Sequence, residues 1–165
     1  MLPVKKGWIS LITYYRSADL AAVVDLFYLA VHAIDSKFYS KDELEAWAAV
    51  DEKKHRMISW REKLKAPYTF LAKMDAQVVG FAHSTETGYL DLLYVHPDYQ
   101  RRGVAKDLVD MVEKALAQSG VEKIETDASI AAKAFFTARG YQVVKKQKIV
   151  RRNEQLINYK MIKDL

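Results

Sequence analysis

Residues 100–105 combine three features that favour binding of an anion. They read Gln-Arg-Arg-Gly-Val-Ala and stand at the start of a segment with helical apolar spacing. The first amides of a helix have no intrahelical partner and lie at the positive end of the helix dipole, so an anion completes their hydrogen bonding. Gly103 allows a ligand to approach the backbone closely, and two arginines add positive charge. The segment predicts a phosphate site; in the simpler alternative, Gly103 only allows a turn and the arginines form a solvated surface.

Other common chemistries lack their residues. The chain has no cysteine, which excludes disulfide bonds, thiol catalysis and cysteine-ligated metals. His32 and His55 lack the spacing of metal ligands, so no metal is expected, and His96 before Pro97 is typical of a turn. The sequence contains neither of the glycine motifs GxxxxGK[ST] and GxGxxG, nor the GxSxG elbow of a serine acyl-enzyme. A mononucleotide P-loop and a serine nucleophile are therefore not expected.

A strand before residues 100–105 and a helix after them would position this site. Leu90–Val95 is an apolar run broken only by Asp91, and it suits a buried strand that ends before Pro97. The next segment has apolar residues at helical spacing, and Ser119-Gly120 supplies its stop. These apolar residues are Val104, Leu108, Met111, Val112, Ala115 and Leu116.

Two motifs resemble those of a known family. Gln100–Ala105, after a strand ending Leu-Tyr-Val-His-Pro, resembles the coenzyme A pyrophosphate motif of the GNAT superfamily of N-acetyltransferases. Residues 134–141, Ala-Phe-Phe-Thr-Ala-Arg-Gly-Tyr, resemble the second signature of that family. The resemblance is strongest from Val78 to Tyr141. It implies one domain over residues 1–165 with an α/β fold, a central mixed, mostly antiparallel sheet of about seven strands flanked by helices.

The resemblance also implies acetyl-coenzyme A as co-substrate. Backbone groups around Leu93 and Val95, on a strand that splays from its neighbour, would hydrogen-bond the pantetheine arm and polarise the thioester carbonyl, which gives Leu93 a catalytic role through its backbone. The residues assigned to the cofactor are Leu93, Tyr94, Val95, Gln100, Arg101, Arg102, Gly103, Val104, Ala105, Lys106, Ser129 and Phe136.

The implied activity is direct transfer of an acetyl group to a primary amine of a small molecule or protein, in a ternary complex. A module that binds acyl-coenzyme A without catalysis and docks a protein or nucleic-acid partner is the alternative. An amine acceptor must lose a proton, and the candidate bases are Asp91, Glu86 and His83. Alternation along the strand puts Asp91 on the face of Leu93 and favours it, although a structural role as hydrogen-bond acceptor stays equally open.

Phe136 departs from the resembling family, in which this position often carries a tyrosine that protonates the leaving thiolate. Phenylalanine cannot donate a proton, but a thiolate with a pKa near about 8.5 is a stable leaving group. We expect Phe136 to pack against the pantetheine arm while solvent or another hydroxyl, such as that of Tyr141, supplies the proton.

The remaining chain predicts a strand at Trp8–Tyr15, a helix from Ser17, and two or three short helices between Ile34 and Leu64. In the resembling family this helical region lines the acceptor pocket. Four aromatic residues are candidates for its walls or for the core, namely Phe38, Tyr39, Trp47 and Trp60. Downstream come a hairpin (Tyr68–Lys73, Val78–His83), a strand at Lys123–Ala128, a helix at Ile130–Arg139, and strands at Tyr141–Val150 and Gln155–Ile162.

Composition indicates a globular protein. Half of the 165 residues are hydrophobic, and no apolar stretch is long enough to span a membrane, so no membrane partner and a cytoplasmic location are expected. The net charge of +5 favours anionic partners in general. The basic residues from Lys145 to Arg152 are interpreted as the polar face of an edge hairpin rather than a nucleic-acid site. The expected partner is a small-molecule or peptide amine acceptor; a homodimer is compatible with the sequence.

Overall fold

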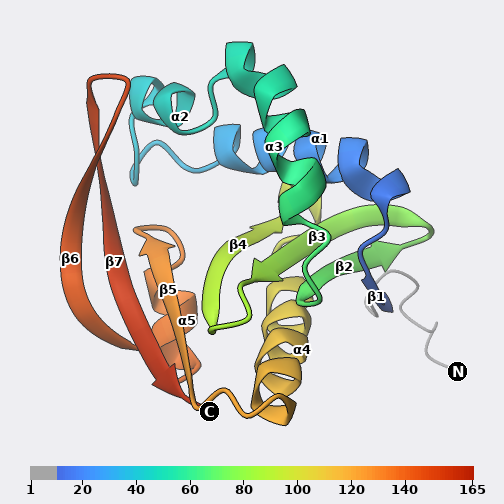
Figure 1. The fold of residues 1–165 in the computed structure, drawn as a ribbon. Coiled ribbons are helices and arrows are strands. Elements are labelled where there is room, and N and C mark those ends of the chain that lie inside the picture. Colours follow the sequence, from blue (N-terminus) through green and yellow to red (C-terminus); the bar gives the residue numbers. More distant parts are fainter. Residues whose placement is uncertain (1–10) are drawn as a thin grey trace, which may run out of the picture.

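The structure is a computed structural model, and it describes residues 11–165 (Figure 1). The strands are β1 (Leu11–Tyr14), β2 (Thr69–Met74), β3 (Gln77–Ser84), β4 (Tyr89–Val95), β5 (Lys123–Ser129), β6 (Gln142–Arg151) and β7 (Glu154–Asp164). The helices are α1 (Leu20–His32), α2 (Lys41–Trp47), α3 (Lys53–Lys63), α4 (Val104–Gln118) and α5 (Lys133–Ala138), with short 3-10 turns η1 (Ser17–Asp19), η2 (Val50–Glu52) and η3 (Pro97–Tyr99). Of the predicted first strand, Trp8–Ser10 lie outside the described residues.

All seven described strands form one sheet in the order β1-β2-β3-β4-β5-β7-β6. Neighbouring strands are antiparallel except β4 and β5, which run parallel. A parallel pair needs a crossover, and α4 supplies it. The predicted α/β fold with a mixed, mostly antiparallel sheet is therefore confirmed.

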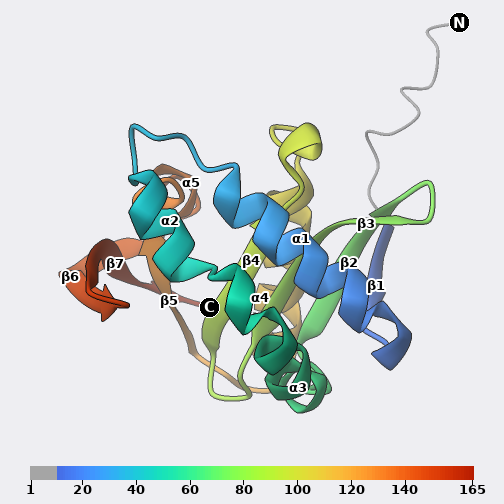
Figure 2. The ribbon, with the colours of Figure 1, turned by 90° about the horizontal axis from the view of Figure 1, so that it is seen from above.

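Helices cover both faces of the sheet (Figures 1 and 2). On one face, α1, α2 and α3 enclose a core that includes Val24, Phe27 and Leu71. On the other face, α4 and α5 enclose a second core that includes Leu108, Ile124 and Phe136. Burial of these two apolar faces gives the sheet its main stabilisation. No helix among residues 11–165 is long and apolar enough to cross a membrane.

A capping box starts α2. Ser40 accepts a hydrogen bond from the Glu43 amide, and the Glu43 carboxylate accepts one from the Ser40 amide. Together they satisfy backbone donors that would otherwise lack partners at the helix start. The box fixes where α2 begins, directly after the loop that carries Tyr39.

Gly80 on β3 brings α4 close to the sheet. A Cβ atom at this position would lie 2.7 Å from Cγ1 of Val104 and 3.0 Å from Cδ1 of Leu108. Only glycine therefore leaves room for the first turns of α4 against β3. This packing sets the start of α4 beside the end of β4, which is the strand that carries Asp91 and Leu93.

Candidate active site

Strands β4 and β5 separate soon after they begin. Their pairing comprises only Tyr89 with Glu125 and Leu90 with Thr126, although both strands continue further. On its other side, β4 pairs with β3 as far as Val95, and the His96 amide donates to the Val79 carbonyl. Because hydrogen bonding alternates along an antiparallel pair, the backbone groups of Leu93 and Val95 face away from β3, toward the opening beside β5. The end of β4 thus offers an unpaired edge.

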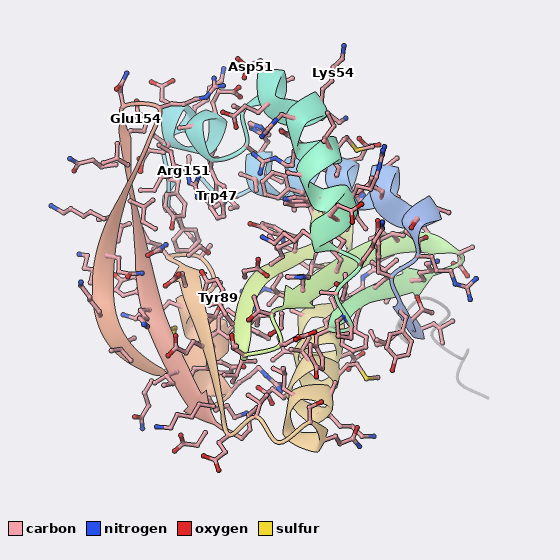
Figure 3. The ribbon with its side chains drawn as sticks, viewed as in Figure 1. Trp47, Asp51, Lys54, Tyr89, Arg151 and Glu154 are labelled. Atoms are coloured by element: carbon pink, nitrogen blue, oxygen red, sulfur yellow. The ribbon has the colours of Figure 1, made fainter. Side chains whose placement is uncertain are left out.

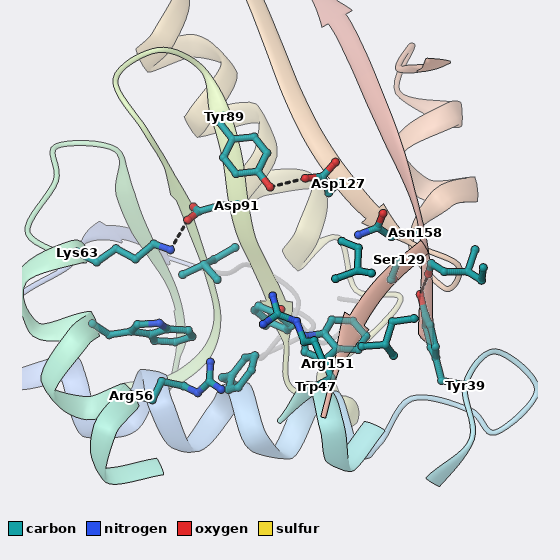
Figure 4. A pocket seen from close by; sticks show the side chains of 17 residues that line it. Tyr39, Trp47, Arg56, Lys63, Tyr89, Asp91, Asp127, Ser129, Arg151 and Asn158 are labelled. Carbon is teal, nitrogen blue, oxygen red and sulfur yellow. Dashed lines mark hydrogen bonds and ion pairs between the residues drawn. The ribbon is translucent and has the colours of Figure 1, made fainter. Parts of the chain in front are cut away.

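A cavity of about 330 Å³ lies beside this opening, on the face covered by α1 to α3 (Figure 4). The volume is that of a small-molecule site. Its aromatic lining residues are Phe27, Tyr39, Trp47, Trp60, Tyr89 and Tyr94. Its charged lining residues are Arg56, Lys63, Asp91, Asp127 and Arg151. Aromatic side chains therefore form much of the cavity wall, and charged side chains of both signs line it as well.

A bulge in β4 decides which side chains enter the cavity. His83 pairs with Leu92, but Ser84 pairs with Leu90, so Asp91 is the extra residue on β4. As a result Asp91 and its neighbour Leu92 both line the cavity, while Leu93 and Val95 pack on the α4 side of the sheet. The prediction that Asp91 shares a face with Leu93 is wrong, because a bulge interrupts the alternation on which it relied.

Asp91 is held by two partners. Nδ1 of His83 on β3 contacts its carboxylate, and Nζ of Lys63 at the end of α3 lies 2.5 Å from the other oxygen. Burial raises the pKa of the Asp91 carboxyl, but the hydrogen bonds from His83 and Lys63 outweigh burial and leave the pKa below its usual value. Asp91 is therefore a carboxylate at neutral pH.

A second carboxylate faces the cavity from β5. The Tyr89 hydroxyl donates to Asp127 over 2.5 Å, and the Gln147 side chain donates to the other Asp127 oxygen over 2.8 Å. Burial and the neighbouring Asp127 carboxylate raise the pKa of the Tyr89 phenol well above its usual value. Tyr89 therefore keeps its proton and holds Asp127 in place across the opening (Figure 4).

Tyr39 joins three parts of the chain at the edge of the cavity. Its hydroxyl donates to the Ile157 carbonyl on β7 over 2.5 Å and accepts from the Ile130 amide after β5 over 2.9 Å. The ring is 3% exposed and packs edge-on against Trp47. Of the predicted aromatic set, Tyr39, Trp47 and Trp60 line the cavity and also pack in the α1–α3 core, whereas Phe38 only packs against that core.

The start of α4 has the geometry of an anion cradle. The first helical hydrogen bond runs from the Asp107 amide to the Gly103 carbonyl, so the amides of Val104, Ala105 and Lys106 precede the helical ladder. Gly103 has φ +82° and nothing within 4 Å of the place where a Cβ would lie. Arg101 also has a positive φ of 58°, and both arginines of the segment are exposed. These groups fit a pyrophosphate on the criteria of open space, free amides and positive charge.

Phe136 is a core residue in this structure. Its ring is 3% exposed and lies edge-on to Tyr141 at 4.9 Å, in the cluster beneath α4. The Tyr141 hydroxyl donates to Glu113, and burial together with the Glu113 charge raises the pKa of this phenol well above its usual value. Neither residue is among those that line the cavity. Tyr141 is thus badly placed to supply a proton there.

The other sequence-predicted residues are distributed around the site. Glu86 is exposed in the turn before β4 and does not line the cavity, and His83 lies behind Asp91, 3% exposed. His96 caps η3 by accepting from the Asp98 amide, which confirms the predicted turn. Ser129 lines the cavity from the end of β5, and its hydroxyl accepts from the Ala132 amide.

Four charged residues that line the cavity were not predicted as site residues from the sequence. They are Arg56, Lys63, Asp127 and Arg151. Arg151 was interpreted only as part of an edge hairpin, and β6 is indeed an edge strand. Alternation along β6 is the signal that could have found it, because Gln147, Ile149 and Arg151 share one face and all three reach the site. Arg56 and Lys63 carry no such signal, because their helix is polar on most of its surface.

No group of three or more His, Asp or Glu side chains within residues 11–165 could hold a metal ion. The charged groups that line the cavity offer hydrogen bonds and ion pairs, and Asp91 and Asp127 offer carboxylates for acid–base chemistry. Three features meet at the end of β4. They are the opening between the parallel strands β4 and β5, the start of α4 with its two arginines, and the cavity lined by charges of both signs.

Comparisons with known proteins agree with this arrangement. Residues 36–163 match the model of the acetyltransferase (GNAT) domain family. The chain is 38% identical over 147 residues to the uncharacterized N-acetyltransferase YafP of Escherichia coli (strain K12), covering 89% of this chain and 91% of that protein.

Two solved structures extend the comparison. A GCN5-related N-acetyltransferase from Rhodopseudomonas palustris superposes with a TM-score of 0.86 at 29% identity, covering 94% of this chain and 96% of that one. The PaiA N-acetyltransferase of Thermoplasma acidophilum, in complex with coenzyme A, superposes with a TM-score of 0.76 at 16% identity, covering 95% of this chain and 99% of that one.

Proposed function

The chain belongs to the GNAT superfamily and is an acetyl-coenzyme A-dependent N-acetyltransferase, and from this we propose that it transfers acetyl directly to a primary amine bound in the cavity beside β4. One observation carries the proposal: β4 leaves β5 after Leu90, and a cavity with carboxylates and aromatic walls opens at that point. The proposed domain comprises residues 1–165. Both substrates would be bound together, in a ternary complex.

The proposed cofactor site runs from the start of α4 to the end of β4. The amides of Arg101 to Lys106 would hold the pyrophosphate, with Gln100 and the two arginines around it. The unpaired backbone edge at Leu93 and Val95 would hydrogen-bond the pantetheine arm, with Tyr94 and Ser129 beside it. A relative of the same fold has coenzyme A bound, which supports this choice of ligand. Phe136 would contribute packing beneath the site, since its ring is buried.

The co-substrate supplies a thioester whose acyl carbon is electrophilic, and the protein supplies position and charge. A backbone amide at Leu93 would stabilise the negative charge that develops on the carbonyl oxygen. Holding the amine beside the thioester removes much of the entropic barrier of a reaction between two molecules. The aromatic walls would exclude water from the cavity.

Asp91 is the proposed proton acceptor for the amine. His83 and Lys63 keep it ionised, so it is ready to accept a proton at neutral pH. A carboxylate of lowered pKa is a weak base, and it would therefore pass the proton on to solvent rather than keep it. The oxygens of both cavity carboxylates have partners, and Asp91 is preferred to Asp127 because it lies on β4, the strand whose backbone at Leu93 would hold the thioester.

Turnover with a panel of primary amines tests the proposed activity. We expect release of free coenzyme A from acetyl-coenzyme A to depend on an added amine, and the acetylated amine to appear in equal amount by mass spectrometry. A direct transfer requires both substrates together, so initial rates at varied concentrations should give intersecting rather than parallel double-reciprocal lines. Tight acetyl-coenzyme A binding without amine-dependent release would instead indicate a non-catalytic binding module.

Changing Phe136 to tyrosine tests how the leaving thiolate is protonated. Phe136→Tyr should leave coenzyme A affinity nearly unchanged and raise kcat little, because the ring lies in the core and the thiolate is a stable leaving group. Stopped assays of kcat and calorimetry of coenzyme A binding measure both effects. An increase in kcat of about a hundredfold, the lower range for general acid catalysis, would show that the wild-type site lacks a needed acid.

A further inference from the structure

Arg151 stands at the end of the cavity that lies toward the β6–β7 turn, opposite Glu154 in the register of the hairpin. Arg56 on α3 and Arg152 in the turn share Glu52, at 3.5 Å and 3.0 Å, and Arg152 also pairs with Asp51 at 2.8 Å. Two carboxylates therefore serve two arginines. Arg151 lines the cavity but pairs with no carboxylate among residues 11–165.

The backbone of β6 directs Arg151 into the cavity. Ile149 and Arg151 line the cavity, and Gln147 on the same face donates a hydrogen bond to Asp127, whereas Lys148 and Val150 lie on the opposite face. Arg151 lines the cavity at its rim, where the residue is also exposed to solvent. Figures 3 and 4 show the Arg151 side chain beside Trp47, between the β6–β7 hairpin and the helices.

Arg56 approaches the cavity from the opposite wall. Its guanidinium lies 4.5 Å from the Phe27 ring centre. Burial raises the pKa of the Tyr94 phenol to about 12, while the charges of Arg56 and Arg151 act to lower it. Both guanidinium groups are therefore near enough to act on the same buried ring.

The co-substrate does not account for these arginines. Its phosphates have a separate proposed site at the start of α4, which packs on the other face of the sheet and has its own exposed arginines, Arg101 and Arg102. Arg56 and Arg151 lie instead on the α1–α3 face, across the cavity from Asp91 and its partner Lys63 (Figure 4). A guanidinium without a carboxylate partner, in an aromatic cavity, is suited to bind an oxyanion through charge-assisted hydrogen bonds.

We propose that the acceptor is a small amine that also carries an oxyanion group, a carboxylate or a phosphate, which Arg151 binds with support from Arg56. The amine would lie at the other end, near Asp91, and the apolar body of the acceptor against Trp47 and Trp60. This inference rests on the proposed function, because it assumes that the cavity holds the acceptor. It names the class of acceptor, which the proposed acetyl transfer to a primary amine does not specify.

Matched pairs of ligands test the inference through binding, without need of turnover. The protein loaded with coenzyme A is titrated calorimetrically with para-(aminomethyl)benzoate, with its carboxamide, in which a neutral amide replaces the carboxylate, and with its phosphonate analogue. The same three compounds with one methylene more between ring and amine form a second set. Wild-type protein should bind at least one acid about tenfold or more tightly than the matched amide, as expected for charge-assisted hydrogen bonds. Comparing the affinities of the carboxylate and the phosphonate then identifies the preferred oxyanion.

Arg151→Gln should bring the ratio of acid to amide affinity close to one. Lys148→Gln is the matched control, because it removes the same charge from the opposite face of β6 and should keep the wild-type ratio. The inference is wrong if no acid of the panel binds more tightly than its amide, or if Arg151→Gln keeps the preference. A preferred acid that binds but is not acetylated from acetyl-coenzyme A would leave the oxyanion site intact and contradict the proposed transfer instead.

Discussion

Replacing Gly103 by glutamate is expected to weaken coenzyme A binding about a hundredfold in a protein that still folds. A carboxylate about 5 Å from the pyrophosphate, at an effective dielectric constant of about 20, repels a unit charge by about 3 kcal/mol. Nothing lies within 4 Å of the new Cβ, so the side chain has room in the folded protein. The measurement is calorimetry with coenzyme A, together with thermal unfolding of the variant without ligand.

Gly120, just beyond the other end of α4, provides a matched control. It has φ +85°, close to the φ +82° of Gly103, and a Cβ added there would also meet nothing within 4 Å. Gly120→Glu therefore carries the same backbone strain, about 1–2 kcal/mol, without placing charge at the helix start. We expect both variants to lose similar stability and only Gly103→Glu to lose affinity. Equal affinities in the two variants would refute the pyrophosphate site.

Asp91→Asn is expected to lower kcat about a hundredfold or more and to leave coenzyme A affinity nearly unchanged. Asparagine keeps the shape and one acceptor oxygen, but it cannot take a proton from the amine. The acidic limb of the pH profile should flatten as well, because this limb reports protonation of the base. Steady-state kinetics across pH, with calorimetry of coenzyme A binding, measure these effects.

Two further variants separate proton transfer from charge alone. Asp127→Asn removes a carboxylate from the same cavity and should change kcat much less, because Asp127 lies on β5, whereas the proposed proton acceptor Asp91 lies on β4, the strand that would hold the thioester. Lys63→Gln removes a cation that lowers the pKa of Asp91, so that pKa should rise and the acidic limb should move to higher pH. If Asp91→Asn keeps the wild-type pH profile of kcat, Asp91 is not the proton acceptor, and solvent or another group takes the proton.

The sequence was most informative where residues near in the chain act together. The β4–α4 unit was predicted from three local features. They are the apolar spacing from Val104 to Leu116, the glycine just before this helix and the length of the preceding apolar run. The turn at His96 follows from the sequence for the same reason. The mixed sheet followed from the order of strands and helices.

The site itself depends on contacts that no local pattern records. The bulge that turns Asp91 away from Leu93 involves neither glycine nor proline, and only the register of β4 against β3 reveals it. Lys63 reaches Asp91 from a helix outside the segment of strongest resemblance, and Asp127 lines the same cavity from a strand beyond α4. Charges that meet across a cavity in this way are placed by tertiary packing, so their pairing could not be predicted.

The hydrogen bonds of Tyr39 have a consequence for how the protein acquires its two sites during folding. Its hydroxyl links residues that are 91 and 118 positions away in the chain, so this contact requires closure of long loops. The cradle at the start of α4, by contrast, needs only β4 and the turn that follows it. Loop-closure entropy delays long-range contacts relative to local ones. The proposed cofactor cradle can therefore form from one short stretch of chain, whereas the cavity proposed for the acceptor exists only after the C-terminal hairpin has docked.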